Sequence, residues 1–288
     1  MELNDMKVYK YQGIEKYHFK TLSRNEIYVP TLNQLNDSRE GAIDINALKL
    51  DINNEVRKTM IQLNPELKIL YELAEKTLNT PSVFMKDIQE RNKCKLIIQQ
   101  VDELLFNQLK SQIDIVIENS GIYSLTNTAS NELMWAHYAN GSQGFVIEYD
   151  SEILAPNKKL EEVEYTTETK KIYFNDFIKK EEELIFTDTQ VLTNHLLAKY
   201  EKFLTQILTR KSSSWSYENE IRLIFRSGEL NNRFFSYNQS AVTAIYFGSK
   251  MNKHHKRYLR CIFKDTHVKF YQIKDDSHNF QLEMIEVQ

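Results

Sequence analysis

Hydrophobic and polar residues alternate along several short stretches of the chain, and a period of two is typical of a β-strand with one buried face. The first stretch is Lys7–Gln12 and the second is Glu26–Pro30, with helical spacing over Ile14–Ser23 between them. Further strand candidates are Ile122–Thr126, Gly144–Asp150, Glu162–Tyr165, Trp215–Arg226, Ala244–Phe247 and Val268–Ile273. We therefore expect strands throughout most of the sequence.

A different pattern occupies residues from about 45 to 119, where the chain is charged and its apolar residues recur at helical spacing. This helical block is interrupted near Asn64-Pro65 and at Asn79–Ser82. It contains no clustered histidines or cysteines and no paired carboxylates on one face, so we interpret it as a scaffold or a surface for a partner protein. Asp176–Arg210 and Lys253–Phe263 are also predicted to be helices.

Helices separated by mixed, mostly antiparallel strands predict an α+β fold. A chain of 288 residues is long enough for one domain with an inserted segment. We predict a single domain spanning residues 1–288, with a large helical insertion at about residues 45–119.

Composition narrows the classes of function. The net charge of −3 is spread along the chain, which argues against tight sequence-independent binding to nucleic acid but leaves a local basic surface open. Cys94 and Cys261 are too few for a disulfide framework, and no apolar run is long enough to cross a membrane. The first residues also lack an apolar signal sequence, so we expect a cytoplasmic protein that is not attached to a membrane. The spacing of the seven glycines allows neither a Rossmann phosphate loop nor a P-loop.

The segment Trp215–Phe225 is the sharpest chemical signal. If it is a strand, Glu218, Glu220 and Arg222 share one face, with Lys211 shortly before them. Two carboxylates beside tryptophan and tyrosine suit a pocket that stacks an aromatic ring and stabilises a developing cation. The competing interpretation is an ordinary solvated outer face.

A second candidate is the segment that begins at Asn131, which can cap a helix. Trp135 and Tyr138 lie three residues apart on that helix, with His137 beside them, and Gly141 can end it in the left-handed conformation. The alternative is that the aromatic residues belong to the core and the histidine is a hydrogen-bonding partner.

A third block combines Lys10 and Tyr11 of the first strand with Asn36, Asp37 and Glu40 after the second. An Asn-Asp pair in a turn commonly makes local backbone hydrogen bonds, which is the simpler explanation. The remaining histidines have no partner at metal-ligand spacing, so no metal site is predicted.

Together these blocks resemble a bacterial family of unknown function that is often encoded in abortive-infection and phage-defence operons. The matching positions are Lys10-Tyr11-Gln12, Leu35–Glu40, Ser124, Met134–Ala139 with Gly144-Phe145, Lys211 with Trp215–Arg222, and Ile245–Gly248. The chain departs from the family pattern at Gln12, where the family has arginine, and at Ser38-Arg39, where it has proline and phenylalanine.

The order of elements in that family is similar to the split-sheet plan of ADP-ribosyltransferases. This resemblance implies an NAD-using transferase or NAD glycohydrolase that acts as a defence or toxin effector. In that interpretation Glu220 stabilises the cationic ribose, Glu218 positions the nucleophile and His137 is a further catalytic candidate. The implied NAD-binding residues are Lys10 and Arg222 at the pyrophosphate, Tyr138 or Trp215 at the nicotinamide, and Tyr11, Ser124, Trp135 and Lys211 around them.

Two other hypotheses remain. In a magnesium-dependent nuclease, Asp37, Glu40, Glu218 and Glu220 would be the metal ligands and Lys211 would contact phosphate. In a non-enzymatic sensor, the rest of the chain would sense a phage protein or a ligand, and the helical block at residues 45–119 would be the functional part, with a partner protein from the same operon as its candidate ligand.

Overall fold

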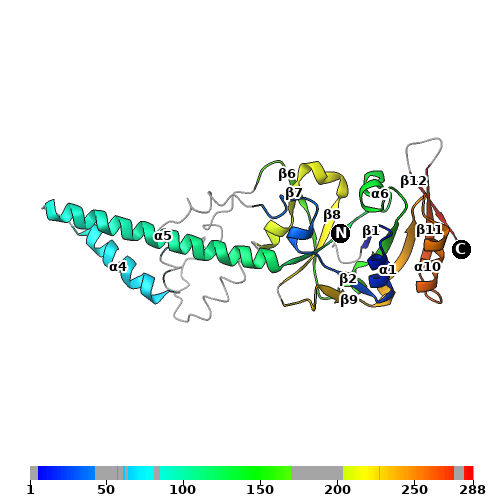
Figure 1. Cartoon of the computed structure of the whole chain (residues 1–288), viewed down its shortest axis with the longest axis horizontal. Coiled ribbons are helices and arrows are strands. Elements are labelled where there is room, and N and C mark those ends of the chain that lie inside the picture. Colours follow the sequence, from blue (N-terminus) through cyan, green and yellow to red (C-terminus); the bar gives the residue numbers. More distant parts are fainter. Residues whose placement is uncertain are drawn as a thin grey trace. The chain divides into compact units, whose positions relative to one another are not determined.

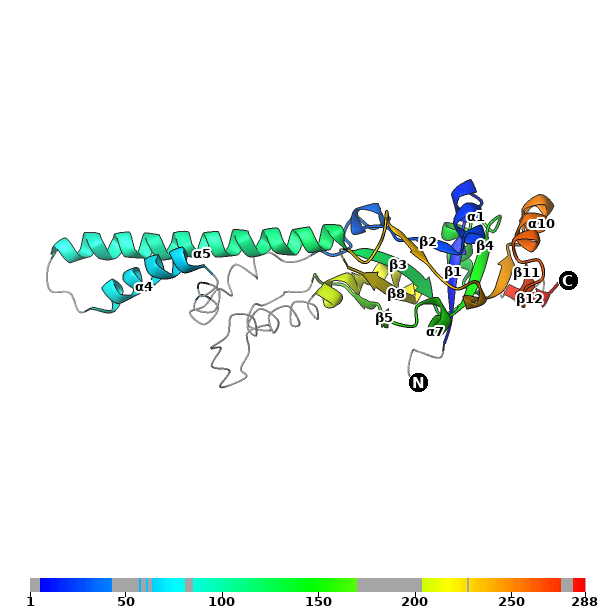
Figure 2. The ribbon, with the colours of Figure 1, turned by 90° about the horizontal axis from the view of Figure 1, so that it is seen from below.

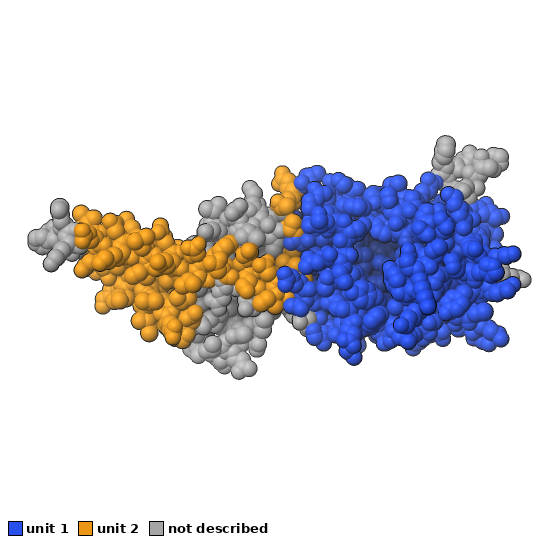
Figure 3. Space-filling model, viewed as in Figure 1, with its two compact units in different colours: residues 1–41, 118–167, 208–288 blue, residues 42–117, 168–207 orange. Residues whose placement is uncertain are grey.

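The structure is a computed structural model of the chain, and it describes residues 6–42, 57, 61, 64–80, 85–169, 204–226, 228–275 and 282–287. The chain divides into two compact units, which are coloured separately in Figure 3. Unit 1 consists of residues 1–41, 118–167 and 208–288, and unit 2 of residues 42–117 and 168–207. A single domain for residues 1–288 stays a prediction.

An eight-stranded sheet runs through unit 1 in the order β12-β11-β10-β4-β1-β3-β8-β5 (Figures 1 and 2). Its strands are β1 (Lys7–Gln12), β3 (Gly121–Thr126), β4 (Phe145–Asp150), β5 (Leu160–Glu162), β8 (Glu220–Phe225), β10 (Val242–Phe247), β11 (Lys269–Asp275) and β12 (Leu282–Glu286). Neighbouring strands are antiparallel except for β10 and β11, which are parallel. The predicted α+β fold with a mixed, mostly antiparallel sheet is confirmed.

Shorter elements surround this sheet. The helices of unit 1 are α1 (Lys16–Ser23), α6 (Glu132–Tyr138), α7 (Ser151–Leu154) and α10 (Lys253–Ile262), and the 3₁₀ helices are η1 (Leu32–Gln34), η2 (Ser213–Glu218) and η3 (Gln239–Ala241). Strand β2 (Glu26–Tyr28) pairs with β9 (Phe234–Ser236), and β6 (Glu164–Thr166) pairs with β7 (Arg210–Ser212). The single strand predicted over Glu162–Tyr165 is therefore wrong, because β5 and β6 join different sheets.

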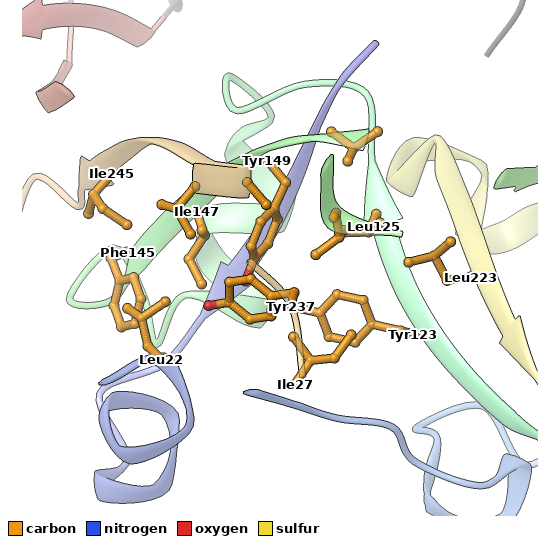
Figure 4. Packing of buried hydrophobic residues seen from close by; sticks show 14 of the residues in the cluster. Leu22, Ile27, Tyr123, Leu125, Phe145, Ile147, Tyr149, Leu223, Tyr237 and Ile245 are labelled. Atoms are coloured by element: carbon orange, nitrogen blue, oxygen red, sulfur yellow. The ribbon is translucent and has the colours of Figure 1, made fainter. Parts of the chain in front are cut away.

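The two faces of the central sheet bury separate hydrophobic clusters, as the alternation within β1 requires. Val8 belongs to the larger cluster, which contains Phe19 of α1 and Leu259 of α10. Figure 4 shows part of this cluster, with Tyr123, Ile147 and Tyr149 among the labelled side chains. The other cluster contains Tyr11 of β1, Trp135 of α6 and Tyr246 of β10. Helix α6 is thus held against the face opposite to α1 and α10.

Unit 2 contains the helices α4 (Pro65–Asn79) and most of α5 (Met85–Asn119). Asn64 caps α4 by accepting a hydrogen bond from the backbone of Leu67, and Tyr71 and Val101 are buried between the helices. The predicted helical block and its interruptions are confirmed for these residues. Most of the predicted helix Asp176–Arg210 lies outside the described residues, which resume with a helical turn at Leu204.

The predicted strand Trp215–Arg226 is correct only in its second half. Ser212 accepts a hydrogen bond from the backbone of Ser214 and begins the 3₁₀ helix η2. Asn219 then has a φ of 44°, a left-handed conformation that asparagine tolerates better than most residues. Strand β8 consequently begins at Glu220. Because Glu218 precedes the strand, the two-residue alternation of the strand does not apply to its side chain.

A close backbone approach at Gly144 gives the first prediction. A Cβ atom at this position would lie 2.1 Å from the carbonyl oxygen of Gln12, whereas one on Gly141, with a φ of +60°, would meet open space. Gly144→Ala should lower the free energy of unfolding by about 1–3 kcal/mol, because the backbone must shift. Gly141→Ala should cost roughly 1 kcal/mol of backbone strain. Urea denaturation measures both, and equal losses would contradict the steric argument.

Candidate active site

The ammonium group of Lys211 lies at the centre of a buried cluster of charges in unit 1. Its Nζ atom is 2.6 Å from Glu218 Oε2, 3.0 Å from Glu220 Oε2 and 3.1 Å from Glu40 Oε1. All four side chains are at most 5% exposed. Buried charges require partners of this kind, since water no longer solvates them.

Arg222 completes the cluster from strand β8. Its Nε donates to Glu220 Oε1 at 2.8 Å, and its second terminal nitrogen contacts both Glu220 and Glu40. The remaining terminal nitrogen donates to the carbonyl oxygen of Leu208 at 2.5 Å. Arg222 is fully buried, so it fixes the carboxylates from behind and does not line the cavity in front of them.

A cavity of about 110 Å³ opens beside these carboxylates. Its lining residues are Tyr9, Lys10, Tyr11, Leu35, Asn36, Glu40, Ser124, Leu125, Thr126, Met134, Tyr138, Lys211, Glu218 and Glu220. The cavity lies where strands β1 and β3 separate. Strand β1 pairs with β4 along its whole length, from Lys7 to Gln12, but it pairs with β3 at Tyr9, opposite Thr126. The three blocks that were separate in the sequence are therefore brought together at one cavity.

The first block reaches the cavity from β1 and from the turn after η1. Lys10 donates to the carbonyl oxygen of Ser124 at 2.7 Å, with its ammonium 4.8 Å from the ring centre of Tyr123. The hydroxyl of Tyr11 accepts a hydrogen bond from the backbone of Asn131, which attaches β1 to the start of α6. Burial lowers the pKa of Lys10 to about 8, although the charges of Glu220 and Glu218 raise it.

Helix α6 contributes Tyr138. The side chain of Asn131 caps this helix by accepting from the backbone of Met134, so the predicted start is confirmed. Gly141 is left-handed as predicted, but the helix already ends at Tyr138, and Asn140 is the first residue after it with a positive φ. The Tyr138 hydroxyl donates to Glu218 Oε1 and accepts from the side chain of Asn36 at 2.7 Å. Glu218 is thus held between a phenol and the ammonium of Lys211.

The two carboxylates at the cavity have pKa values displaced in opposite directions. Burial raises the pKa of Glu218 and outweighs its hydrogen bonds to Lys211 and Tyr138. Burial also acts to raise the pKa of Glu220, but the charge and hydrogen bonds of Arg222 outweigh it and hold this pKa at about 2. Glu220 is therefore a permanent anion near neutral pH, whereas Glu218 is the group better suited to exchange a proton.

Besides Arg222, three of the predicted catalytic or NAD-binding residues do not line the cavity. Trp135 is 1% exposed, stacks edge-on against Tyr11 and donates its indole N–H to Ala129, so it is a core residue. His137 is exposed, with its ring 6.1 Å from that of Tyr217. The ring of Trp215 lies 5.3 Å from Lys211 Nζ and is partly exposed.

Thr126 and Tyr165 are among the residues at this site that the sequence did not predict. Thr126 lies opposite Glu220 in the register of β3 and β8, and its buried hydroxyl in the cavity wall has no hydrogen-bond partner among the described residues. The Tyr165 hydroxyl accepts from the backbone N–H of Glu220 at 2.8 Å. Period-two spacing could have assigned Thr126 to the face of Ser124, but no local pattern points to Tyr165.

Asp37 does not join the other carboxylates. It is buried and accepts from the backbone of Arg39, as the turn interpretation predicts. Among the described residues, no group of three or more His, Cys, Asp or Glu side chains could hold a metal ion. None of the described helices is long and apolar enough to cross a membrane.

Comparison with known proteins finds a similarity over part of the chain that includes some of these residues. Residues 134–223 match the model of a family described as a protein of unknown function, DUF2971. The matched segment runs from α6 into β8 and so contains Tyr138, Lys211, Glu218 and Glu220. No curated protein and no solved structure matches the chain.

The charge cluster predicts a large difference between two neighbouring cations. Lys211→Met leaves three buried carboxylates without their shared ammonium, so the free energy of unfolding should fall by about 3–5 kcal/mol at pH 7. Arg210→Met removes a pair with Glu164, whose side chain is 63% exposed, and should cost less than about 1 kcal/mol. Urea denaturation compares them, and similar losses would show that the cluster is not a stabilising unit.

The low pKa of Glu220 predicts part of the acid sensitivity. Because this pKa falls from 4.5 to about 2 on folding, the ionised form stabilises the native state above pH 4.5, and that contribution is lost as the pH falls towards 2. In the Glu220→Gln variant, the free energy of unfolding should lack this component of its pH dependence. Denaturation at a series of pH values tests it, and an unchanged acid slope would contradict the assignment.

Proposed function

We propose that the cavity binds the ribose end of NAD and that the protein cleaves the nicotinamide–ribose bond, by hydrolysis or by transfer to an acceptor. One observation carries this proposal: Glu218 and Glu220 face the same cavity, with pKa values displaced in opposite directions. Such a pair supplies a fixed anion and a proton acceptor at one reacting carbon.

Glu220 would be the fixed anion. When the bond from ribose C1′ to the nicotinamide nitrogen breaks, its electron pair leaves with nicotinamide and positive charge develops on the ribose. A preorganised carboxylate stabilises that charge in the transition state more than it stabilises the substrate. Arg222 and Lys211 hold the carboxylate in place, so little reorganisation is required during the reaction.

Glu218 would take the proton of the attacking group. Water or an acceptor hydroxyl forms the new bond to C1′, and its proton passes to the Glu218 carboxylate. The hydroxyl of Tyr138 orients Glu218 Oε1, while Asn36 orients Tyr138. The raised pKa of Glu218 makes it a stronger base than an ordinary carboxylate when it is ionised.

The size of the cavity limits which part of NAD it receives. Pockets that enclose a whole ligand are commonly about 300–1,000 Å³, and this cavity is about 110 Å³. It therefore suits the ribose, with Tyr138 at its wall to contact nicotinamide. Lys10 is the cation placed to meet a phosphate, and the burial of Arg222 removes it from that role.

The same geometry disfavours the magnesium-dependent nuclease. The ammonium of Lys211 already lies within 3.1 Å of Glu40, Glu218 and Glu220, where a divalent ion would have to bind. Asp37, the fourth predicted ligand, forms its own turn instead. A defence or toxin role, cytoplasmic localisation and a partner bound by the helical block stay predictions from the sequence.

Nicotinamide release from NAD tests the proposed function. Glu220→Gln keeps the shape of the side chain but removes the charge, so turnover should fall by roughly 10²–10³-fold. Glu218→Gln should also slow turnover, and it should abolish the fall in kcat/KM on the acid side of the pH profile, because that fall reports the protonation of Glu218.

The matched control is Glu162→Gln, which neutralises an exposed carboxylate on β5 and should leave turnover unchanged. Every nicotinamide-release assay contains a chelator, and circular dichroism establishes that each variant is folded. No nicotinamide release by the wild type with any tested acceptor, or cleavage of phosphodiesters only after magnesium is added, would overturn the proposal.

A further inference from the structure

The outward faces of α1 and α10 form a basic surface on unit 1. The helices lie side by side (Figures 1 and 2), and Phe19 of α1 packs against Tyr258 and His255 of α10 at ring-centre distances of 5.6 and 5.4 Å. We call their exposed residues the α1–α10 face. It is distinct from the cavity, because α6 covers the opposite side of the sheet.

Unpaired cations dominate this face. Its exposed basic residues are Lys16, Lys20 and Arg24 on or next to α1, and Lys253, His254, Arg257 and Lys264 on or next to α10. Neither helix contains an acidic residue, and the exposed acidic residues next to them are Glu15 and Asp265. Within the described part of the chain, no ion pair joins these side chains to an acidic partner, and Glu15, which precedes α1, pairs with His18. On a chain with a net charge of −3, such a concentration of positive charge indicates an anionic partner.

Aromatic rings stand among these cations. Tyr17 is 56% exposed and Tyr258 is 50% exposed, and they are the large hydrophobic residues that these two helices leave in solvent. A helix that binds a lipid surface inserts aliphatic and aromatic side chains together. Exposed rings between lysines and arginines instead match the combination of stacking and phosphate contacts that binds unpaired nucleotides.

We propose that the α1–α10 face binds single-stranded nucleic acid. The lysines and arginines contact backbone phosphates without reading sequence, and the rings of Tyr17 and Tyr258 stack on unpaired bases. A duplex keeps its bases stacked on one another, so it can use the phosphate contacts but not the rings. The face therefore prefers a single strand to a duplex of equal charge.

Fluorescence anisotropy of a labelled single-stranded oligonucleotide tests this with the full chain, and it requires neither NAD nor catalysis. Lys253→Glu combined with Arg257→Glu should weaken binding at least 10-fold and should make the affinity less dependent on salt, by about 0.7 in the logarithmic slope for each lost phosphate contact. Lys93→Glu combined with Lys95→Glu changes the net charge equally on exposed positions of α5 and should leave the affinity nearly unchanged.

Tyr258→Leu separates the stacking contribution from the charges while keeping an apolar contact to Phe19. It should weaken single-strand binding about 5-fold or more and leave the binding of heparin, which has charge but no bases, unchanged. Equal weakening by the two double variants would overturn the proposal. It would also be overturned if duplex, heparin or anionic vesicles bound as tightly as the single strand, or if Tyr258→Leu had no effect.

Discussion

The ammonium of Lys211, buried among three carboxylates, is the interaction on which the site depends. Glu40, Glu218 and Glu220 could not remain ionised side by side without it, since each would be a desolvated anion facing two others. The four charged side chains come from two parts of the sequence: Glu40 from the turn after η1, and the other three from the continuous stretch of β7, η2 and β8. The ammonium of Lys211 thus links this stretch to a turn about 170 residues earlier in the chain.

The two cations of the cluster also give Glu218 and Glu220 different pKa values. Arg222 contacts both oxygens of Glu220, whereas Glu218 shares its oxygens between Lys211 and the phenol of Tyr138. Burial acts to raise both pKa values, and the charge and hydrogen bonds of Arg222 are the largest causes that lower the pKa of Glu220, so the difference comes mainly from the guanidinium. A single arginine on the strand is enough to give two adjacent glutamates different protonation behaviour.

Local patterns predicted the fold well because the strands and helices here follow them. Period-two spacing placed Glu220 and Arg222 on one face, and the cap residue Asn131 placed the start of α6. The position of Glu218 was reached for the wrong reason, because the strand begins only after the left-handed turn at Asn219. That turn depends on hydrogen bonds within η2, and the alternation of hydrophobic and polar residues does not predict such bonds.

Other parts of the site could not be predicted from local sequence. Trp135 belongs to the core because Tyr11 and Ala129 surround its ring, and both lie on other segments. The position of Tyr165 beside Glu220 likewise depends on how distant strands meet. Such contacts are set by tertiary packing, so residue type alone could not separate a wall of the cavity from a neighbour of the core.

The cluster has a second consequence, which concerns the length of the chain. Glu40 is two residues before unit 2 begins, Tyr165 is three residues before the chain enters it again, and Leu208 is the first residue after it ends. All three are bound to Arg222 or Glu220 within unit 1. Three of the four ends of the segments that form unit 2 are therefore anchored at the site itself, and the fourth leads into β3. The entropic cost of connecting fixed ends varies only with the logarithm of the length of the connection. The sequence between these ends can diverge or grow while the geometry of the carboxylates is preserved.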